Sequence, residues 1–354
     1  LREYVVSEAM HALGVPTTRA LAAVLSGDWL QRDTAEPGAI ICRVAKSHIR
    51  IGSFQYLAAH GDTEQLKTFA DYVIARHYPD CAAADNPYLA LLAAVISTQA
   101  QLIAKWMSLG FIHGVMNTDN MSILGLTLDY GPFKMLDGFD PDLIFNHSDT
   151  NGRYTYNQQA SIAFWNLHCL AEALLPLIQD IDATKNALET YREVYSQAFL
   201  HEFGAKLGLD ELTVTENDRP LIHQLLRLLS EEKIDYTWFW QQLAQTLKTN
   251  NPSHARDLFI HRENFDVWHA LYLQRLQSLD LNNVLSTMGK SNPRYILRNH
   301  LAQIAIQKAQ LGDYSEINQL LEVLQNPYQI HSLYDDYARP APAWAGSIEI
   351  SCSS

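Results

Sequence analysis

The sequence predicts a mainly helical protein with a small strand content, of the α+β class. Apolar residues recur at helical spacing along most of the chain, and from residue 157 onward almost every segment shows this pattern. Runs with the composition of strands are few and short. One loop, residues 113–133, separates the helices and is rich in Asp, Asn and Gly, so we expect the chemistry to lie there.

The beginning of the chain combines helix and strand signals. An apolar face over residues 1–13 predicts a helix, which ends at Gly14 because a glycine followed by Val15-Pro16 is typical of a helix C-terminus. Residues 18–25 and 39–45 are predicted as short strands, with a polar loop over residues 27–37 between them.

Cap residues predict most of the other helices. Ser47 and Thr63 are expected to be N-caps, and Pro87 is expected in the first turn of a long helix that ends near Gly110. The predicted helices cover residues 47–59, 63–76, 87–110, 158–177, 181–206, 218–231, 235–248, 262–278, 299–311 and 315–324.

Two stretches are expected to be non-helical. A β-like pair is predicted at residues 121–124 and 134–136, on either side of the second half of the 113–133 loop. The last stretch, from residue 327, is rich in Pro, Tyr, Asp and Ser and is expected to run extended over the surface.

Composition restricts the classes of partner. The 354 residues carry a net charge of −13 without a cluster of Lys or Arg, which argues against nucleic acid, because binding its backbone needs phosphate neutralisation. The four cysteines lie far apart with no CxxC pair, which fits a reducing compartment. The longest apolar run, residues 88–96, is too short to span a membrane. We therefore expect no nucleic-acid and no membrane partner. A monomer is also expected.

The chain begins at Leu1 rather than Met, inside a predicted helix. We therefore expect that the natural N-terminus is missing and that a targeting segment cannot be read from this sequence. A cytoplasmic location is expected if the protein is bacterial.

The loop at 113–133 begins His-Gly-Val-Met-Asn-Thr-Asp-Asn and ends Asp-Tyr-Gly-Pro-Phe. Kinase-like folds use an Asn and a following Asp of this kind to hold Mg²⁺ against ATP phosphates, so Asn120 and Asp129 are the predicted metal ligands. In the phosphotransferase form His-Gly-Asp-x-x-x-x-Asn the third residue is the catalytic base, and here it is Val115. The metal ligands are therefore present and the usual base is not.

Each of these residues also has a simpler interpretation. Asn120 and Asp129 are of types common in turns, and for either one alone that interpretation is favoured, whereas the whole string favours a metal site. Asp119 could accept the proton of an attacking hydroxyl. It could equally orient Asn117 or a backbone amide, and both alternatives stay open.

Three charged residues outside the loop are further candidates. Arg43 and Arg50 flank the predicted helix start at Ser47, and Arg binds phosphate well, but on spacing alone two surface salt bridges explain them better. Glu3 lies on the first helix. In kinase folds a helix Glu pairs with a strand Lys that holds phosphates, but no such Lys precedes Glu3 in this chain.

Together these segments resemble the selenoprotein O family, whose members are kinase-fold protein adenylyltransferases. The similarity extends over essentially the whole chain, in the family's order. The segments that carry it are residues 113–133, residues 1–10 (Leu-Arg-Glu and Ser-Glu-Ala-Met), 43–45 (Arg-Val-Ala), 292–299 (Asn-Pro-Arg-Tyr-Ile-Leu-Arg-Asn) and 351–354 (Ser-Cys-Ser-Ser).

The resemblance implies an activity that accounts for Val115. Family members bind ATP in a flipped orientation and transfer AMP to Ser, Thr or Tyr hydroxyls of proteins. It implies that Asp119 is the proton acceptor and that Asn120 and Asp129 bind Mg²⁺ (or Mn²⁺). The residues that it assigns to ATP binding are Arg43, Arg50, Asp129 and Glu3.

The resemblance also implies three parts: a remnant of the kinase N-lobe (1–30), a kinase-like C-lobe with the metal and ATP site (31–215), and a helical C-terminal extension with its tail (216–354). The family's Gly-rich loop and strand Lys lie upstream of Leu1, so this fragment is expected to bind ATP poorly and to be impaired alone.

One further implication concerns redox chemistry. Cys352 matches the position where some relatives carry selenocysteine. Some relatives can pair a Cys after the Asp129 turn with the C-terminal Cys, but Phe145 stands in that segment here, so this disulfide is not expected.

Two other functions remain open. An ordinary phosphotransferase would need Asp119 to replace the base that Val115 lacks. A non-catalytic pseudokinase would bind partners without performing chemistry.

Overall fold

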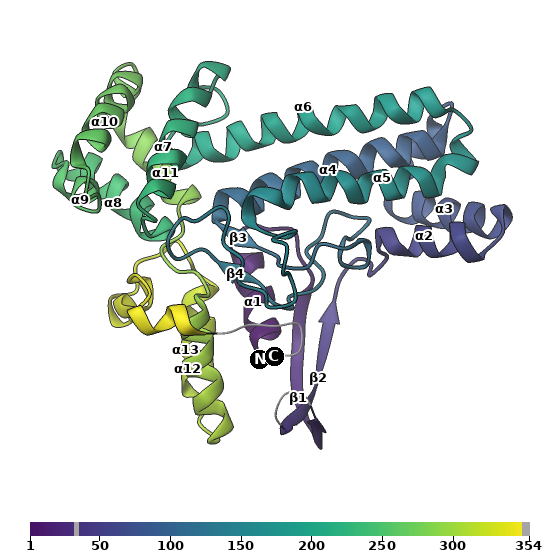
Figure 1. The fold of residues 1–354 in the computed structure, drawn as a ribbon, viewed down its shortest axis with the longest axis horizontal. Coiled ribbons are helices and arrows are strands. Elements are labelled where there is room, and N and C mark those ends of the chain that lie inside the picture. The colour runs from purple at the N-terminus through teal and green to yellow at the C-terminus, as the bar shows by residue number, and fades with distance from the viewer. Residues whose placement is uncertain (32–34, 349–354) are drawn as a thin grey trace.

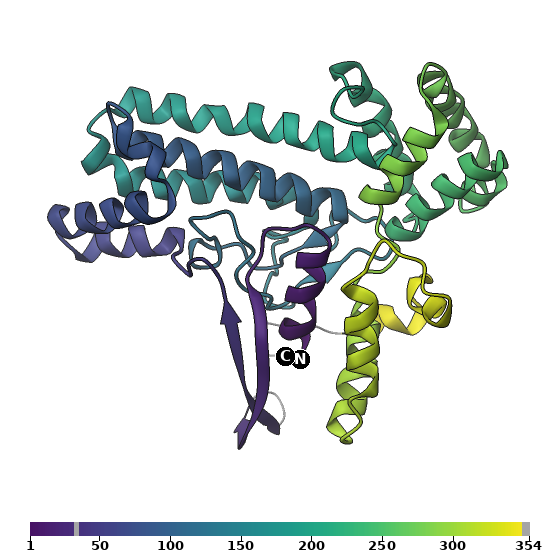
Figure 2. The same ribbon diagram turned by 180° about the vertical axis from the view of Figure 1, so that it is seen from behind.

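The computed structural model describes residues 1–31 and 35–348, and this part of the chain is mainly helical with two small sheets, as predicted. Three long helices, α4 (Pro87–Leu109), α5 (Gln159–Ile178) and α6 (Ile181–Lys206), pack side by side in one layer (Figure 1). Helix α1 (Arg2–Ala12) and a hairpin lie below this layer, and the hairpin projects away from it in both views (Figures 1 and 2).

Helix α4 is the centre of the layer because most of its surface is apolar. Val95 and Ile103 are fully buried, and the helix packs against both α5 and α6. The side chain of Asn86 caps its start by accepting the amide of Leu89 (3.1 Å), and Gly110 ends it in the left-handed region with φ 70°. Both predicted ends of this helix are confirmed.

Two helical segments, Pro87–Leu109 and Tyr156–Ile178, are long and apolar enough to cross a membrane by length and composition. About half of each apolar window, 50% and 56%, is buried inside the protein, as in a core helix. The expectation that no segment is long enough was wrong. It counted uninterrupted apolar residues, and the polar residues 97–99 (Ser-Thr-Gln) interrupt the run without breaking the helix.

The hairpin is longer than predicted. Strands β1 (Arg19–Gln31) and β2 (Ala35–Val44) pair antiparallel along their length. Most of the loop predicted at 27–37 is therefore strand, and the rest of it, residues 32–34, lies outside the described residues. Gly27, with φ 86°, lies at a shift in the strand register, so the hairpin continues through a bulge where the polar composition had indicated a loop.

Two helices have N-caps other than those predicted. Helix α2 (Ile51–His60) begins after Ser47 and not at it, because the residues just before Ile51 pair with residues 121–123 and are extended. Helix α3 (Thr63–His77) is capped by Asp62 and not by Thr63.

The second sheet consists of β3 (Phe111–Ile112) and β4 (Lys134–Met135). The prediction that residues 121–124 pair with β4 was wrong. That segment instead forms isolated bridges with Thr127 and Arg50.

The helices of residues 219–291 lie beside one end of the layer, and those of residues 299–324 lie below it, on the side of α1 (Figures 1 and 2). Helices α9 (Ser253–Arg256) and α11 (Leu281–Ser291) were not predicted, and α11 buries only Val284 and Met288, which leaves too few apolar positions to show a period. The other helices were predicted to within a few residues: α7 (Arg219–Glu231), α8 (Tyr236–Thr249), α10 (Arg262–Leu276), α12 (Asn299–Gln310) and α13 (Ser315–Leu324).

Short 3₁₀ turns join these elements. The tail forms two of them and buries Ala338 and Ala345, so it is not extended as predicted. Cys352 lies outside the described residues. The turns are η1 (Pro79–Ala83), η2 (Thr118–Asn120), η3 (Tyr156–Gln158), η4 (Glu216–Asp218), η5 (Ser332–Ala338) and η6 (Ala343–Ser347).

The predicted division into parts at residues 30 and 215 stays a prediction. The β1–β2 hairpin crosses the first of these boundaries. Helix α1 packs against both β1 and α13, so the predicted first and third parts are in contact.

Candidate functional site

The loop at 113–133 is held between distant parts of the chain. It follows the end of α4 and contains η2. The amide of Ile51 donates to the carbonyl of Met121 (2.9 Å), which joins the loop to the start of α2. The amide of Thr18 donates to the carbonyl of Thr127 (3.1 Å), which joins it to the beginning of the hairpin. These two backbone bonds hold the loop in place against the hairpin and against the start of α2.

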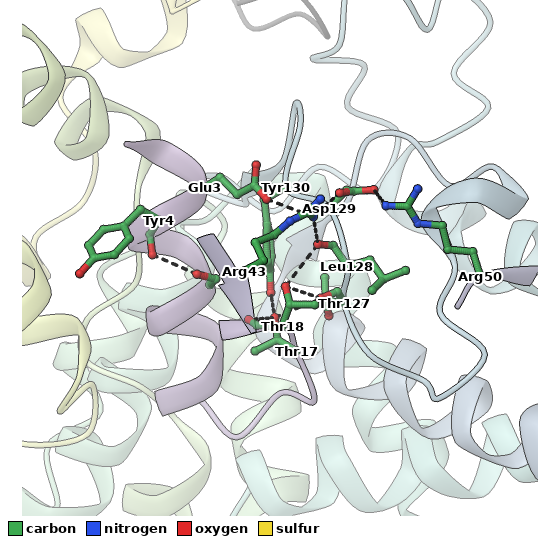
Figure 3. A network of polar contacts seen from close by, with 11 residues as sticks. Glu3, Tyr4, Thr17, Thr18, Arg43, Arg50, Thr127, Leu128, Asp129 and Tyr130 are labelled. Atoms are coloured by element: carbon green, nitrogen blue, oxygen red, sulfur yellow. Dashed lines mark hydrogen bonds and ion pairs between the residues drawn. The ribbon is translucent and has the colours of Figure 1, made fainter. Parts of the chain in front are cut away.

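Asp129 is the centre of a cluster of charged side chains (Figure 3). One of its carboxylate oxygens accepts from Nη1 of Arg43, and the other accepts from Nη2 of Arg50 at 3.3 Å. Nη1 of Arg43 also donates to the carbonyl of Leu128 (2.7 Å) and lies 3.2 Å from Oε1 of Glu3. The structure therefore brings together four residues that the sequence separates: Glu3, Arg43, Arg50 and Asp129.

Glu3 is the least satisfied member of this cluster. Burial raises the pKa of its carboxyl group, Arg43 partly offsets that effect, and Asp129 raises the pKa further. Within the described residues its Oε1 is buried and accepts no hydrogen bond, although Arg43 lies close enough for an ion pair. Oε1 of Glu3 is therefore the acceptor of this cluster that lacks a hydrogen bond in the described part of the chain.

Asp119 and Asn120 lie on η2, in the same loop. Among the described residues neither makes a hydrogen bond or ion pair with Asp129. Nδ2 of Asn120 donates to the carbonyl of Val115 (3.0 Å), so the amide oxygen of Asn120 points away from that carbonyl. The side chain of Asp119 is exposed, so a molecule in solution can reach it.

The donors in this loop suit a hard cation such as Mg²⁺. Asp129 offers a carboxylate and Asn120 an amide oxygen, and Mg²⁺ usually binds one or two carboxylates while keeping waters and substrate phosphates. In the described part of the chain no group of three or more His, Cys, Asp or Glu side chains could hold a metal. Coordination of Mg²⁺ by Asp129 and Asn120 would therefore need further ligands from solvent or substrate.

A second set of contacts, not predicted from the sequence, fixes the turn that carries Asp129. The hydroxyl of Thr17 donates to the carbonyl of Thr127 (3.2 Å), so it accepts the hydrogen bond that it shares with the hydroxyl of Tyr130. Tyr130 is buried, and burial raises the pKa of its phenol, so it remains a neutral donor. No local signal in the sequence marks Thr17.

His113 is buried beside Trp106 and Phe111, with ring centroids 5.3 and 6.3 Å away. Burial lowers its pKa to about 4. Its Nδ1 accepts the amide of Val115 (3.4 Å), so the neutral ring carries its proton on Nε2. This histidine is placed to hold the loop and not to exchange protons with solvent.

Comparison with known proteins shows which family this chain resembles. The sequence profile of the family described as "Protein adenylyltransferase SelO" matches residues 1–325. The chain is 49% identical to "Protein nucleotidyltransferase YdiU" of Variovorax paradoxus (strain S110) over 358 residues, which cover 100% of this chain and 72% of the relative. It is 47% identical to proteins of the same name from Cupriavidus metallidurans and Albidiferax ferrireducens, again over 100% of this chain and over 68% and 73% of those relatives.

Proposed function

The chain belongs to the SelO family of protein adenylyltransferases, and from this premise we propose how its residues transfer AMP. As a member of that family it is a nucleotidyltransferase that uses ATP as its substrate. The roles of single residues, the metal and the kinase-like fold go beyond this and form the proposal. The observation that supports them most is the pairing of the Asp129 carboxylate with both Arg43 and Arg50.

The proposed reaction is attack by a Ser, Thr or Tyr hydroxyl of a protein on the α-phosphorus of ATP. A bond forms between the hydroxyl oxygen and the α-phosphorus, the bond from that phosphorus to the oxygen leading to the β-phosphate breaks, and pyrophosphate leaves. Asp119 accepts the hydroxyl proton. Its exposure supports this role, because a protein substrate must reach the base from solvent.

Arg43 and Arg50 bind phosphate groups in this proposal. Both pair with Asp129 in the structure, and phosphate oxygens are acceptors of the same kind. When ATP binds, the guanidinium groups exchange a carboxylate for phosphates and release Asp129. The released carboxylate and the amide oxygen of Asn120 would hold Mg²⁺ (or Mn²⁺), which neutralises charge on the phosphates when it is bound.

A kinase-like C-lobe is the arrangement that this proposal needs. A helix with Glu3, two strands with Arg43, a long helix and then the His113 and Asp129 loop follow one another in the order expected for that fold. The monomeric state, the absence of nucleic-acid and membrane partners and a cytoplasmic location remain proposals from composition.

The position of the transferred label tests the proposed reaction. The complete gene product is incubated with Mg²⁺, candidate protein substrates and ATP that carries ³²P at either the α or the γ position. We expect covalent label on protein from the α position only, because pyrophosphate takes the γ-phosphorus away. Label from the γ position only would mean that the protein is a phosphotransferase in spite of Val115.

A further inference from the structure

Gly52, the second residue of α2, lies against the side chain of Asp119. A β-carbon at Gly52 would lie 2.0 Å from Oδ1 of Asp119, 3.0 Å from its Cγ and 3.4 Å from its backbone nitrogen. Gly52 is helical and buried, so its backbone conformation does not require a glycine. The reason for a glycine at this position is the close approach of the Asp119 carboxylate.

The two sides of this contact are fixed relative to each other. The amide of Ile51 donates to the carbonyl of Met121 (2.9 Å), and the amide of Ile123 donates to the carbonyl of Ile49 (3.0 Å). The first bond lies one residue from Gly52 and two residues from Asp119, and the second lies three residues from Gly52 and four from Asp119. Helix α2 therefore cannot move back to make room for a β-carbon without losing backbone pairing.

The Asp119 carboxylate can move where the backbone cannot. Its side chain is exposed, so rotation away from an added methyl group costs the fold little. Rotation would nevertheless carry the oxygen away from the place that it occupies beside α2. A shift of about 1 Å in a reacting group can cost about 10²-fold in rate.

We propose that Gly52 is a positioning residue, which sets where the Asp119 carboxylate lies by leaving space for it at the first turn of α2. This inference rests on the proposed function, in which Asp119 accepts the hydroxyl proton. Gly52 touches neither ATP nor the acceptor hydroxyl in this account. Its effect on the rate passes through Asp119 alone.

The test compares Gly52→Ala with Gly289→Ala in the complete gene product. Gly289 lies in helix α11, is exposed, and a β-carbon there would have no heavy atom within 4 Å, so the control makes the same substitution without the contact. Alanine favours a helix over glycine at both positions. We expect kcat of AMP transfer to fall at least about tenfold in Gly52→Ala, with KM for ATP within about twofold and Tm equal or higher. Gly289→Ala should keep the wild-type kcat.

The separation of kcat from Tm and KM distinguishes positioning from structural damage. A fall in Tm and in ATP-binding stoichiometry that matches the fall in kcat would overturn the inference, since it would mean that Gly52→Ala misfolds. Wild-type kcat in Gly52→Ala would overturn it as well.

Asp119→Asn, measured in the same series, separates this inference from the proposed function. Loss of transfer in Asp119→Asn together with wild-type kcat in Gly52→Ala would reject the role of Gly52 alone. Full transfer in Asp119→Asn would reject the proposed base and the role of Gly52 with it.

Discussion

Charged side chains of opposite sign pair with one another at the site. Asp129 pairs with Arg43 and Arg50, and Glu3 shares Arg43. Entry of a metal alone would place a cation beside two guanidinium groups, and entry of ATP alone would place phosphates beside two carboxylates. The metal and the nucleotide are therefore expected to bind together more tightly than either binds alone.

Removal of Arg43 should separate these two affinities. In Arg43→Ala we expect Mn²⁺ to bind about tenfold more tightly without nucleotide, because one cation beside Asp129 is gone, and ATP with Mg²⁺ to bind about tenfold more weakly. Titration with Mn²⁺ followed by electron paramagnetic resonance, and calorimetry with ATP, measure the two changes. Arg227→Ala, which breaks an exposed pair with Glu231, is the control and should change neither. Unchanged Mn²⁺ affinity in Arg43→Ala would contradict the exchange of partners.

His113 gives the folding stability a pH dependence of known sign. Burial lowers its pKa from 6.5 to about 4, so the unfolded chain takes up the proton first as the pH falls. The free energy of unfolding should be highest above pH 6.5 and should decrease by about 3 kcal/mol as the pH falls to 4. Urea unfolding at several pH values should show a smaller decrease in His113→Gln. Substitution of the exposed His60 by Gln should leave the decrease unchanged, and an equal decrease in all three proteins would contradict this account.

At the scale of elements, helix α5 holds the start of the 113–133 loop through one side chain. In the described part of the chain the sheet of β3 and β4 has two strands, and Gln159 at the start of α5 bonds to the backbone of β3 and of His113, which follows it. Its Oε1 accepts the amide of His113 (3.0 Å) and its Nε2 donates to the carbonyl of Phe111 (2.9 Å). One buried side chain thus connects the helical layer to the loop.

Replacement of Gln159 by Leu should leave these two backbone groups without partners. Because the site is fully buried, we expect the free energy of unfolding to fall by about 2–4 kcal/mol. Urea denaturation measures the loss. Gln158→Leu, at the exposed neighbouring position, is the matched control and should lose far less. Equal losses in the two variants would mean that the hydrogen bonds of Gln159 are not what stabilises the loop.

The helical layer could be predicted from the sequence because its signals are local. Helix α6 (Ile181–Lys206) has the predicted limits, and Asn86 and Gly110 mark the ends of α4. The pairing of β4 was missed because it depends on which segment lies nearest in space. The bulge at Gly27 was missed because a glycine in a polar stretch indicates a loop as readily as a strand.

The candidate site was predictable only in part. Asp119, Asn120 and Asp129 belong to one continuous string and were identified from it. Spacing alone favoured surface salt bridges for Arg43 and Arg50, and their convergence on Asp129 depends on the tertiary structure. Thr17 and Gly52 gave no signal, because a small residue that leaves space or accepts one hydrogen bond has no pattern of its own.

At the scale of the whole molecule, the C-terminal helices are joined to the site by arginines. Arg298, just before α12, is 1% exposed and pairs with Asp137 (2.7 Å) and Asp235 (2.9 Å). Arg2, on the helix of Glu3, donates to Asn299 (3.2 Å) and stacks over Phe133 at the end of the loop. The C-terminal region therefore helps to hold the helix that carries Glu3.

Loss of Arg298 should loosen the C-terminal helices. Arg298→Met leaves two carboxylates in a largely buried place, so we expect the free energy of unfolding to fall by about 3–5 kcal/mol. Limited proteolysis should then cut near α12 faster than in the wild type. Arg339→Met, which breaks an exposed pair with Asp336, is the control and should alter neither stability nor cleavage. Wild-type protection in Arg298→Met would show that apolar packing alone holds these helices.

The measurement that tests the central claim most directly is the rate of AMP transfer by Asp119→Asn at saturating ATP and Mg²⁺. The claim is that the loop keeps its metal ligands while the base has moved from position 115, now Val115, to Asp119. The account predicts that kcat falls by about 10²–10⁴-fold while ATP with Mg²⁺ still binds, because Arg43, Arg50 and Asp129 are intact. A kcat within about twofold of the wild type would contradict it, since a proton acceptor in this reaction cannot be dispensable.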